Sequence, residues 1–218
     1  VSLDPRLTPA ANAQRLYKRY NKSKNARVEL TRQIALGEAE LVYLDSVFDA
    51  LTHAETGADL TEIREELYRS GYASRMKQYK VTLSRKKAHP EVLWFRTTNG
   101  FRVACGKNNT QNEYVTHVLA GKTDYWFHAK GTAGSHAVLF CEGREPDVQD
   151  FTDAAEIAAY YSKASSSSAG TSNAEVDYTL AKNVKKPAGA KPGFVIYHTN
   201  WSCVVSPSAA RVEAMREG

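Results

Sequence analysis

The sequence predicts an α+β protein, with a long helical arm of the coiled-coil type over residues 1–80 and a mostly antiparallel β-sheet domain with packed helices over residues 81–210. Two observations lead to this fold class. From about residue 12 to residue 55 there is no proline, Gly37 is the sole glycine, and apolar residues recur at spacings of three, four or seven. Beyond about residue 78, short runs of β-forming residues alternate with turn signals.

The first predicted helix is long and has one apolar stripe, formed by Leu30, Ile34, Leu41, Leu44, Phe48 and Leu51. At ~1.5 Å per residue such a helix would extend about 65 Å, too long for the interior of a small domain. Thr56-Gly57 should end it, and Asp59 should cap a second helix that runs to about Tyr72. Because the second helix is too short to cover the first, the basic N-terminal half of the long helix lacks a partner within this chain. Self-association through the exposed stripe is one way in which it could be covered.

The remaining elements follow in order along the chain. VLWFRT, Asn99-Gly100 and FRVACG predict a hairpin with a type I′ turn, and GKNNTQN predicts a polar loop that opens a short helix. Pro146 marks the start of a helix whose inner stripe is Val148, Phe151, Ala155, Ala158 and Tyr161. SSSSAGTSN is typical of a linker. The predicted strands are DYWFHAK, SHAVLFCE, EVDYTLA, FVIYH and SCVVSP.

Positive charge is concentrated in the first part of the chain. Residues 1–90 hold 16 Lys and Arg against 11 Asp and Glu, whereas residues 91–218 hold 13 of each. Glu29 is the sole acid among the residues from Arg15 to Arg32, a segment that includes Lys18, Arg19, Lys22 and Lys24. A second run without acids comprises Arg75, Lys77, Lys80, Arg85, Lys86 and Lys87. Such clusters suit a polyphosphate partner, and the alternative explanation is a solvated helix face.

Several function classes are not expected. No stretch is long and apolar enough to cross a bilayer, and VSLDPRLTPA has no features of a secretory signal, so we expect a cytoplasmic protein without membrane insertion. Cys105, Cys141 and Cys203 are too few and too scattered for a disulfide framework. There is no Walker motif and no GxGxxG. We therefore expect no cofactor.

The histidines are the main candidates for a catalytic or metal site. A metal site would use Asp124, His128, His136 and perhaps Cys141, but their spacing is not diagnostic. Ser135 and His136 are neighbours on a strand, so their side chains point to opposite faces and cannot form a nucleophile–base pair. The sequence thus predicts neither a metal centre nor an enzyme.

The segment DYWFHAK, residues 124–130, is the strongest candidate for recognition. A period of two places Asp124, Trp126, His128 and Lys130 on one face, with Tyr125, Phe127 and Ala129 toward the core. The polar face, together with His136 of the next strand, suits stacking and hydrogen bonding to nucleotides. If so, Trp126→Ala should lower RNA affinity and leave the thermal midpoint nearly unchanged. The alternative is an Asp–His hydrogen bond that supports the turn from Gly131 to Gly134.

Two loops offer further donors. GKNN presents Lys107, Asn108 and Asn109 at a helix start, where they would either bind an anion or cap the helix. KNVKKPAGAKPG presents lysines on a bend stiffened by Pro and Gly, as a loop that follows phosphates would. Its lysines are Lys182, Lys185, Lys186 and Lys191.

Five ordered motifs together resemble the NFACT family: LDPRLTPAANAQRLYKRYNKSK, GKNNTQNEYVT, D-x-W-x-H-x-K followed by GSHAV, AAYYSKA, and VDYTLAKNVKKPAGAKPG. Bacterial members are ribosome quality-control factors and also appear in streptococci as fibronectin-binding proteins. The resemblance implies the C-terminal part of such a protein: the descending coiled-coil limb, whose partner limb would lie upstream, and the NFACT-R domain.

The resemblance further implies binding to the obstructed large ribosomal subunit, rRNA and tRNA, and support of alanine tailing without mRNA, with the peptide bond formed by the ribosome. An adhesin that binds fibronectin at the cell surface is the alternative from another class. Two positions depart from the family pattern. Ala133 replaces a proline, which would make its turn less rigid, and His117 replaces a lysine, which would weaken a phosphate contact.

Overall fold

The structure is a computed structural model that describes residues 2–72, 89–163 and 173–217. It forms two compact units, Val1–Tyr43 and Leu44–Gly218. This division falls within the first helix, and the domain boundary near residue 80 stays a prediction. The second helix belongs to the same unit as the β-sheet. The second basic run, Arg75 to Lys87, lies outside the described residues.

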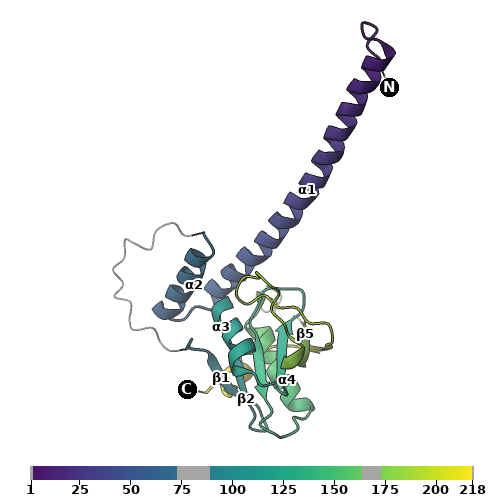
Figure 1. The fold of residues 1–218 in the computed structure, drawn as a ribbon. Helices are drawn as coiled ribbons and strands as arrows, with labels where there is room; N and C mark the ends of the chain where they lie inside the picture. Colours follow the sequence, from purple (N-terminus) through teal and green to yellow (C-terminus); the bar gives the residue numbers. More distant parts are fainter. Residues whose placement is uncertain (1, 73–88, 164–172, 218) are drawn as a thin grey trace. The chain divides into compact units, whose positions relative to one another are not determined.

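The long helix is continuous: α1 spans Pro9–Thr52, a length of 44 residues (Figure 1). Its start is fixed by Thr8, whose hydroxyl accepts a hydrogen bond from the Ala11 amide at 3.2 Å. The predicted apolar stripe is exposed along its whole length, as shown by the exposed fractions of 60% for Ile34 and 70% for Phe48. In the described part of the chain, none of its six side chains is buried.

The second helix, α2, spans Gly57–Arg69 and begins one turn after α1 ends. The sequence suggested Asp59 as the N-cap of α2, and this prediction is wrong. Thr56 is the N-cap, and Asp59 is the third residue of a capping box in which each side chain bonds the other residue's backbone amide. Ile63 anchors the inner face of α2 with 2% of its surface exposed.

The domain contains an antiparallel sheet of six strands in the order β1-β2-β4-β3-β5-β6. The strands are β1 (Leu93–Arg96), β2 (Arg102–Cys105), β3 (Tyr125–Ala129), β4 (Ala137–Phe140), β5 (Ala174–Leu180) and β6 (Trp201–Val205). With the helices of both units, this confirms the predicted α+β class. It also confirms the antiparallel sheet.

The β1–β2 hairpin is confirmed, but its turn is not type I′. Only Gly100 has positive φ, at 82°, whereas type I′ requires positive φ at Asn99 as well. The Gly100 amide donates to the Thr97 carbonyl and the Thr97 amide to the Phe101 carbonyl, both at 2.9 Å, which defines a three-residue loop. The loop docks on the helix α4 (Val148–Tyr160), where the Thr97 hydroxyl donates to Asp150 at 2.6 Å.

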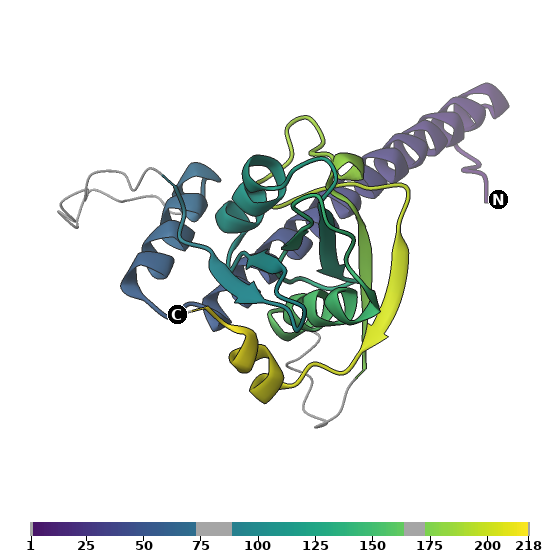
Figure 2. The same ribbon diagram turned by 90° about the horizontal axis from the view of Figure 1, so that it is seen from below.

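One face of the sheet is covered by α4 (Val148–Tyr160) and by α5 (Ala209–Met215), a helix that the sequence did not indicate (Figure 2). Phe127 and Leu139 of the sheet pack there with Ile157 of α4, all fully buried. Val148, expected on this inner stripe, is instead 82% exposed.

The opposite face is also covered. It lies beneath α3 (Asn109–Tyr114), the π-helix η1 (Val115–Leu119) and the segment that follows the 3-10 helix η3 (Ala181–Asn183). FVIYH is part of this segment and is not a strand; only Ile196 forms a β-bridge, with Lys185. Val195 and Tyr197 pack on the sheet from the loop, so both faces of the sheet are core.

Candidate nucleic-acid interface

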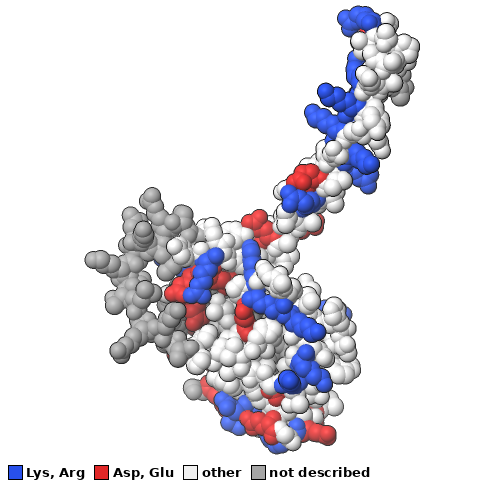
Figure 3. Space-filling model, in the orientation of Figure 1, with Lys and Arg blue, Asp and Glu red and all other residues white. Residues whose placement is uncertain are grey.

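The basic residues of α1 form an exposed stripe. Arg15, Lys18, Arg19 and Lys22 follow at intervals of three and four, which places them on one side of the helix. Lys18, Arg19, Lys22 and Lys24 have no ion pair within the described residues, whereas Arg15 pairs with Asp4 at 3.3 Å. Figure 3 shows Lys and Arg side chains, in blue, exposed along the long helix. Lys18, Arg19, Lys22 and Lys24 can therefore neutralise phosphates without first breaking ion pairs.

The same helix also presents two exposed aromatic rings. Tyr17 and Tyr20 are 67% and 59% exposed, and their ring centroids lie 6.3 Å apart. Lys24 follows Tyr20 by one helical turn, so rings and cations alternate around this part of α1. Such a mixture of ring faces and cations suits RNA better than it suits a small anion.

The polar face of residues 124–130 is not an exposed surface. The predicted alternation is confirmed, since Phe127 joins the α4 side of the core and Trp126 joins the other side. However, the Trp126 side chain is fully buried, because η1 and the segment around Val184 cover it. Its exposure was predicted wrongly, and the ring cannot stack on a nucleobase in this conformation.

A histidine pair lies beside Trp126. His128 stacks on the indole with centroids 5.7 Å apart, and His136 meets it edge-on at 5.0 Å. Burial lowers the pKa of His128 to about 4, although the Asp177 carboxylate opposes the shift. Burial and the neighbouring imidazole also hold the pKa of His136 well below its usual value. Both rings are therefore neutral at pH 7.

Hydrogen bonds fix this cluster within the fold. His136 Nδ1 lies 2.8 Å from the Thr116 hydroxyl, and Asp177 accepts from Tyr197 at 2.9 Å and from Ser202 at 2.6 Å. The Trp126 Nε1 atom is buried without a hydrogen-bond partner among the described residues. These contacts give the cluster a structural role beneath the loop of residues 183–197.

Asp124 and Lys130, at the two ends of β3, are also held by local partners. The Asp124 carboxylate accepts from the Gly121 amide at 2.7 Å and from the Cys141 amide at 3.0 Å, so it shapes the turn that precedes the strand. The alternative expected an Asp–His hydrogen bond, but the carboxylate of Asp124 bonds these backbone amides instead. Lys130 is exposed but forms an ion pair with Glu175 of the neighbouring strand.

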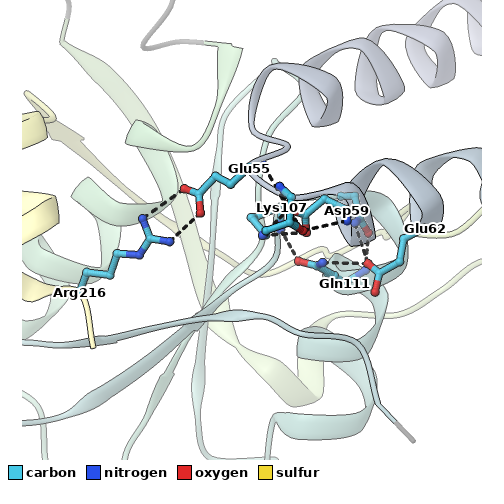
Figure 4. Close-up of polar contacts among 8 residues, drawn as sticks. Glu55, Asp59, Glu62, Lys107, Gln111 and Arg216 are labelled. Carbon is cyan, nitrogen blue, oxygen red and sulfur yellow. Dashed lines mark hydrogen bonds and ion pairs between the residues drawn. The ribbon is translucent and has the colours of Figure 1, made fainter. Parts of the chain in front are cut away.

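The side chains of the GKNN loop bond to acidic residues of α2. Lys107 Nζ lies 2.7 Å from Asp59, with 7% and 5% of the two side chains exposed (Figure 4). Burial would raise the pKa of Asp59, but hydrogen bonds from Lys107 and Thr56 outweigh it and hold the pKa below its usual value. A lysine buried in such a pair is not available to an RNA phosphate.

The amides of the same loop extend this junction. Asn108 Nδ2 and Gln111 Nε2 both donate to Glu62, at 3.0 and 2.8 Å, and Asn109 Nδ2 donates to Glu66 at 2.9 Å. Asn108 also caps α3 through the Gln111 amide, as one of the two sequence interpretations had it. The sequence missed the partners because the acids lie more than 40 positions earlier in the chain.

In the loop KNVKKPAGAKPG, some of the lysines have partners within the fold and others do not. Lys186 binds both carboxylate oxygens of Glu113 at 2.8 Å, and Lys191 donates to the Tyr72 hydroxyl at 3.0 Å. Lys182 and Lys185 are exposed and have no ion-pair partner within the described parts of the chain. Of the four lysines expected to contact phosphates, these two are in a position to do so.

Among the described residues, no group of three or more His, Cys, Asp and Glu side chains has a geometry that would hold a metal ion. The three cysteines are free thiols, and burial raises the pKa of Cys105 to about 12. Over the same ranges, every helix is too short or too polar to cross a bilayer.

An RNA-binding class of protein is therefore the one that the exposed, unpaired cations support. Residues 1–87 match the NFACT N-terminal and middle domains, and residues 91–199 match the NFACT protein RNA binding domain. The chain belongs to the NFACT family.

The relatives are informative in both sequence and structure. The chain is 41% identical over 217 residues to a Bacillus subtilis protein named Rqc2 homolog RqcH and 40% identical over 216 residues to the Streptococcus suis protein of that name. These matches cover 100% and 99% of the chain but 37% of each relative, so the chain spans little more than a third of their length. A solved C-terminal fragment of the Streptococcus suis fibronectin/fibrinogen-binding protein is 37% identical, with a TM-score of 0.81. That match covers 95% of the chain and 80% of the fragment.

Proposed function

We propose that this chain is the RNA-contacting part of a ribosome quality-control factor that acts in the cytoplasm. The intact protein would bind the obstructed large ribosomal subunit and tRNA, and support addition of alanine to stalled nascent chains without mRNA. Peptide bonds would be formed by the ribosome, so this chain would need no catalytic residue, cofactor or metal. The family membership and the relatives named Rqc2 homolog RqcH support this role.

The observation that carries the proposal is the set of unpaired cations in the basic stripe of α1. Lys18, Arg19 and Lys22 are exposed and have no acidic partner within the described residues. Contact with about six phosphates would make affinity fall on the order of 10³-fold between 50 and 200 mM salt. The proposal thus predicts steeply salt-dependent binding.

The test is binding of the chain to purified large ribosomal subunits at low and physiological salt. The variant Lys18→Gln/Arg19→Gln/Lys22→Gln should bind more weakly, with a log–log salt slope that is smaller by about 2, at ~0.7 per lost contact. Arg69→Gln is the matched control, because it removes an exposed cation that is already paired with Glu65 at 3.1 Å. Absence of binding by the unaltered chain at both salt concentrations would refute the proposal.

A fibronectin-binding adhesin at the cell surface is the second candidate function. It is favoured by the 37% identity to a solved fragment whose name includes fibronectin and fibrinogen binding. The basic stripe of α1 gives no support to this candidate, since a protein ligand does not require it. Saturable binding of the chain to immobilised fibronectin at micromolar concentration would support an adhesin, and its absence would eliminate this role.

A further inference from the structure

Three segments meet at one end of the sheet. The Ala181 amide at the start of η3 donates to the Asp124 carbonyl at 2.8 Å, which joins η3 to the turn that holds Lys122. Tyr125 pairs with Leu180, and Tyr178 pairs with Trp201 at the start of β6. Lys122, Lys182 and Trp201 therefore flank the same end of the sheet, and we name these three residues the strand-end patch.

Trp201 is the aromatic component of the patch. It stacks on Tyr178 with centroids 5.7 Å apart, and Tyr178 stacks in turn on Phe127 at 5.5 Å. This column of rings fixes the orientation of the indole from the buried side. Trp201 is nevertheless 50% exposed, because β6 is an edge strand in the described sheet. A held ring with a solvent-exposed surface is a platform for stacking.

Lys122 and Lys182 provide positive charge that no acidic side chain of the described ranges neutralises. Lys122 and Lys182 are exposed, and neither has an ion-pair partner in the described ranges. Elsewhere on the domain, Lys130 and Lys186 are exposed but paired with Glu175 and Glu113. The strand-end patch thus combines free cations with an accessible indole.

We propose that Trp201 stacks on an unpaired nucleobase while Lys122 and Lys182 contact the phosphates on either side of that nucleotide. This inference rests on the proposed RNA-binding function and adds the class of ligand, namely single-stranded RNA with accessible bases. A duplex does not fit the patch, because its bases are already stacked on one another. Stacking on an aromatic ring is tolerant of sequence, so the patch would read strandedness and not base identity.

The test uses the fluorescence of the intact chain. Of its three tryptophans, Trp126 is fully buried and Trp94 is half-buried beneath the Arg102 guanidinium, so Trp201 is the most accessible fluorophore. A 12-nucleotide uridine oligomer should quench this fluorescence, and a blunt RNA duplex of equal charge should quench it little. Trp201→Phe should abolish most of the quenching while it preserves the ring column on Tyr178.

Affinity is measured in parallel with a dye-labelled oligomer. Trp201→Ala should weaken binding on the order of tenfold, within the range of one stacked base. Lys122→Gln/Lys182→Gln should lower the log–log salt slope by about 1.4, at ~0.7 per phosphate of a single strand. Lys163→Gln is the control, because Lys163 is an exposed cation that pairs with Asp45 at 3.5 Å.

The outcomes separate this inference from the function on which it rests. Unchanged affinity and unchanged quenching in the Trp201 variants would overturn the inference. Binding to ribosomal subunits without binding to the oligomer would also overturn it and would leave the proposed function intact. If the unaltered chain binds neither subunits nor oligomer, both proposals fail.

Discussion

Replacement of Lys107 by alanine should destabilise the domain and should not act primarily on RNA binding. The Lys107 ammonium lies 2.7 and 2.8 Å from the two carboxylate oxygens of Asp59, and both side chains are buried. Removal of one member of a buried ion pair leaves the other charge without compensation and costs about 3–5 kcal/mol. Asp59 keeps its hydrogen bonds from Thr56, so we expect a loss of about 3 kcal/mol, at the lower end of that range.

The assay is urea unfolding of the intact chain, followed by circular dichroism. Lys107→Ala should shift the midpoint to lower urea, by ~1–3 M at an m-value of about 1–3 kcal/mol/M. The double variant Lys107→Met/Asp59→Asn removes both charges and should recover part of the loss, because the uncompensated carboxylate is then absent. A tenfold loss of RNA affinity at an unchanged midpoint would refute this reasoning and return Lys107 to the nucleic-acid interface.

Three further perturbations test the buried polar groups. Burial raises the pKa of Asp49 from 3.8 to about 7, so its contribution to stability is fully present below pH 4 and is lost as the pH rises to 7. Asp49→Asn should therefore raise the free energy of unfolding by ~2–4 kcal/mol relative to the unaltered chain between pH 5 and pH 8, as measured by urea unfolding. Trp126→Ala should cost about 3–5 kcal/mol and lower the thermal midpoint by roughly 10 °C, whereas an unchanged midpoint with weaker RNA binding would restore the recognition role. Tyr197→Phe removes the 2.9 Å hydrogen bond to Asp177 and should cost ~1–3 kcal/mol, and equal urea midpoints would show that water replaces the hydroxyl.

Features encoded by local periodicity were predictable from the sequence. The apolar spacing from Leu30 to Leu51 gives a helix, and the alternation in residues 124–130 gives a strand with Phe127 and Trp126 on opposite faces. Both patterns depend on residues that are close in the chain. The asparagines of GKNN also allowed a helix cap as one of two interpretations, and Asn108 is the N-cap of α3, because capping is decided within one helical turn.

The exposure of a strand face was not predictable in this way. Whether Trp126 meets solvent depends on Val184, Val195 and Tyr197, which lie about 60 to 70 positions later and form a loop, not a strand. Likewise, Lys107 looks like a phosphate ligand until Asp59 is placed beside it. Polar residue types identify donors, but only tertiary structure identifies their acceptors. Trp201 is an apolar residue that tertiary structure leaves exposed, since its position at the start of an edge strand leaves it half exposed.

The polar junction between α2 and the GKNN loop bears on where the RNA-binding domain begins. The family match for that domain starts at residue 91, yet Asp59, Glu62 and Glu66 of α2 accept hydrogen bonds from residues 107–111. A protein that starts at residue 89 would expose Lys107 without its carboxylate and would acquire a cation that the intact chain neutralises. Such a protein should bind RNA with a salt slope steeper by about 0.7 than residues 44–218, or should unfold at lower urea. Equal slopes and equal midpoints for the two proteins would mean that α2 is dispensable, and that the domain is complete at its family boundary.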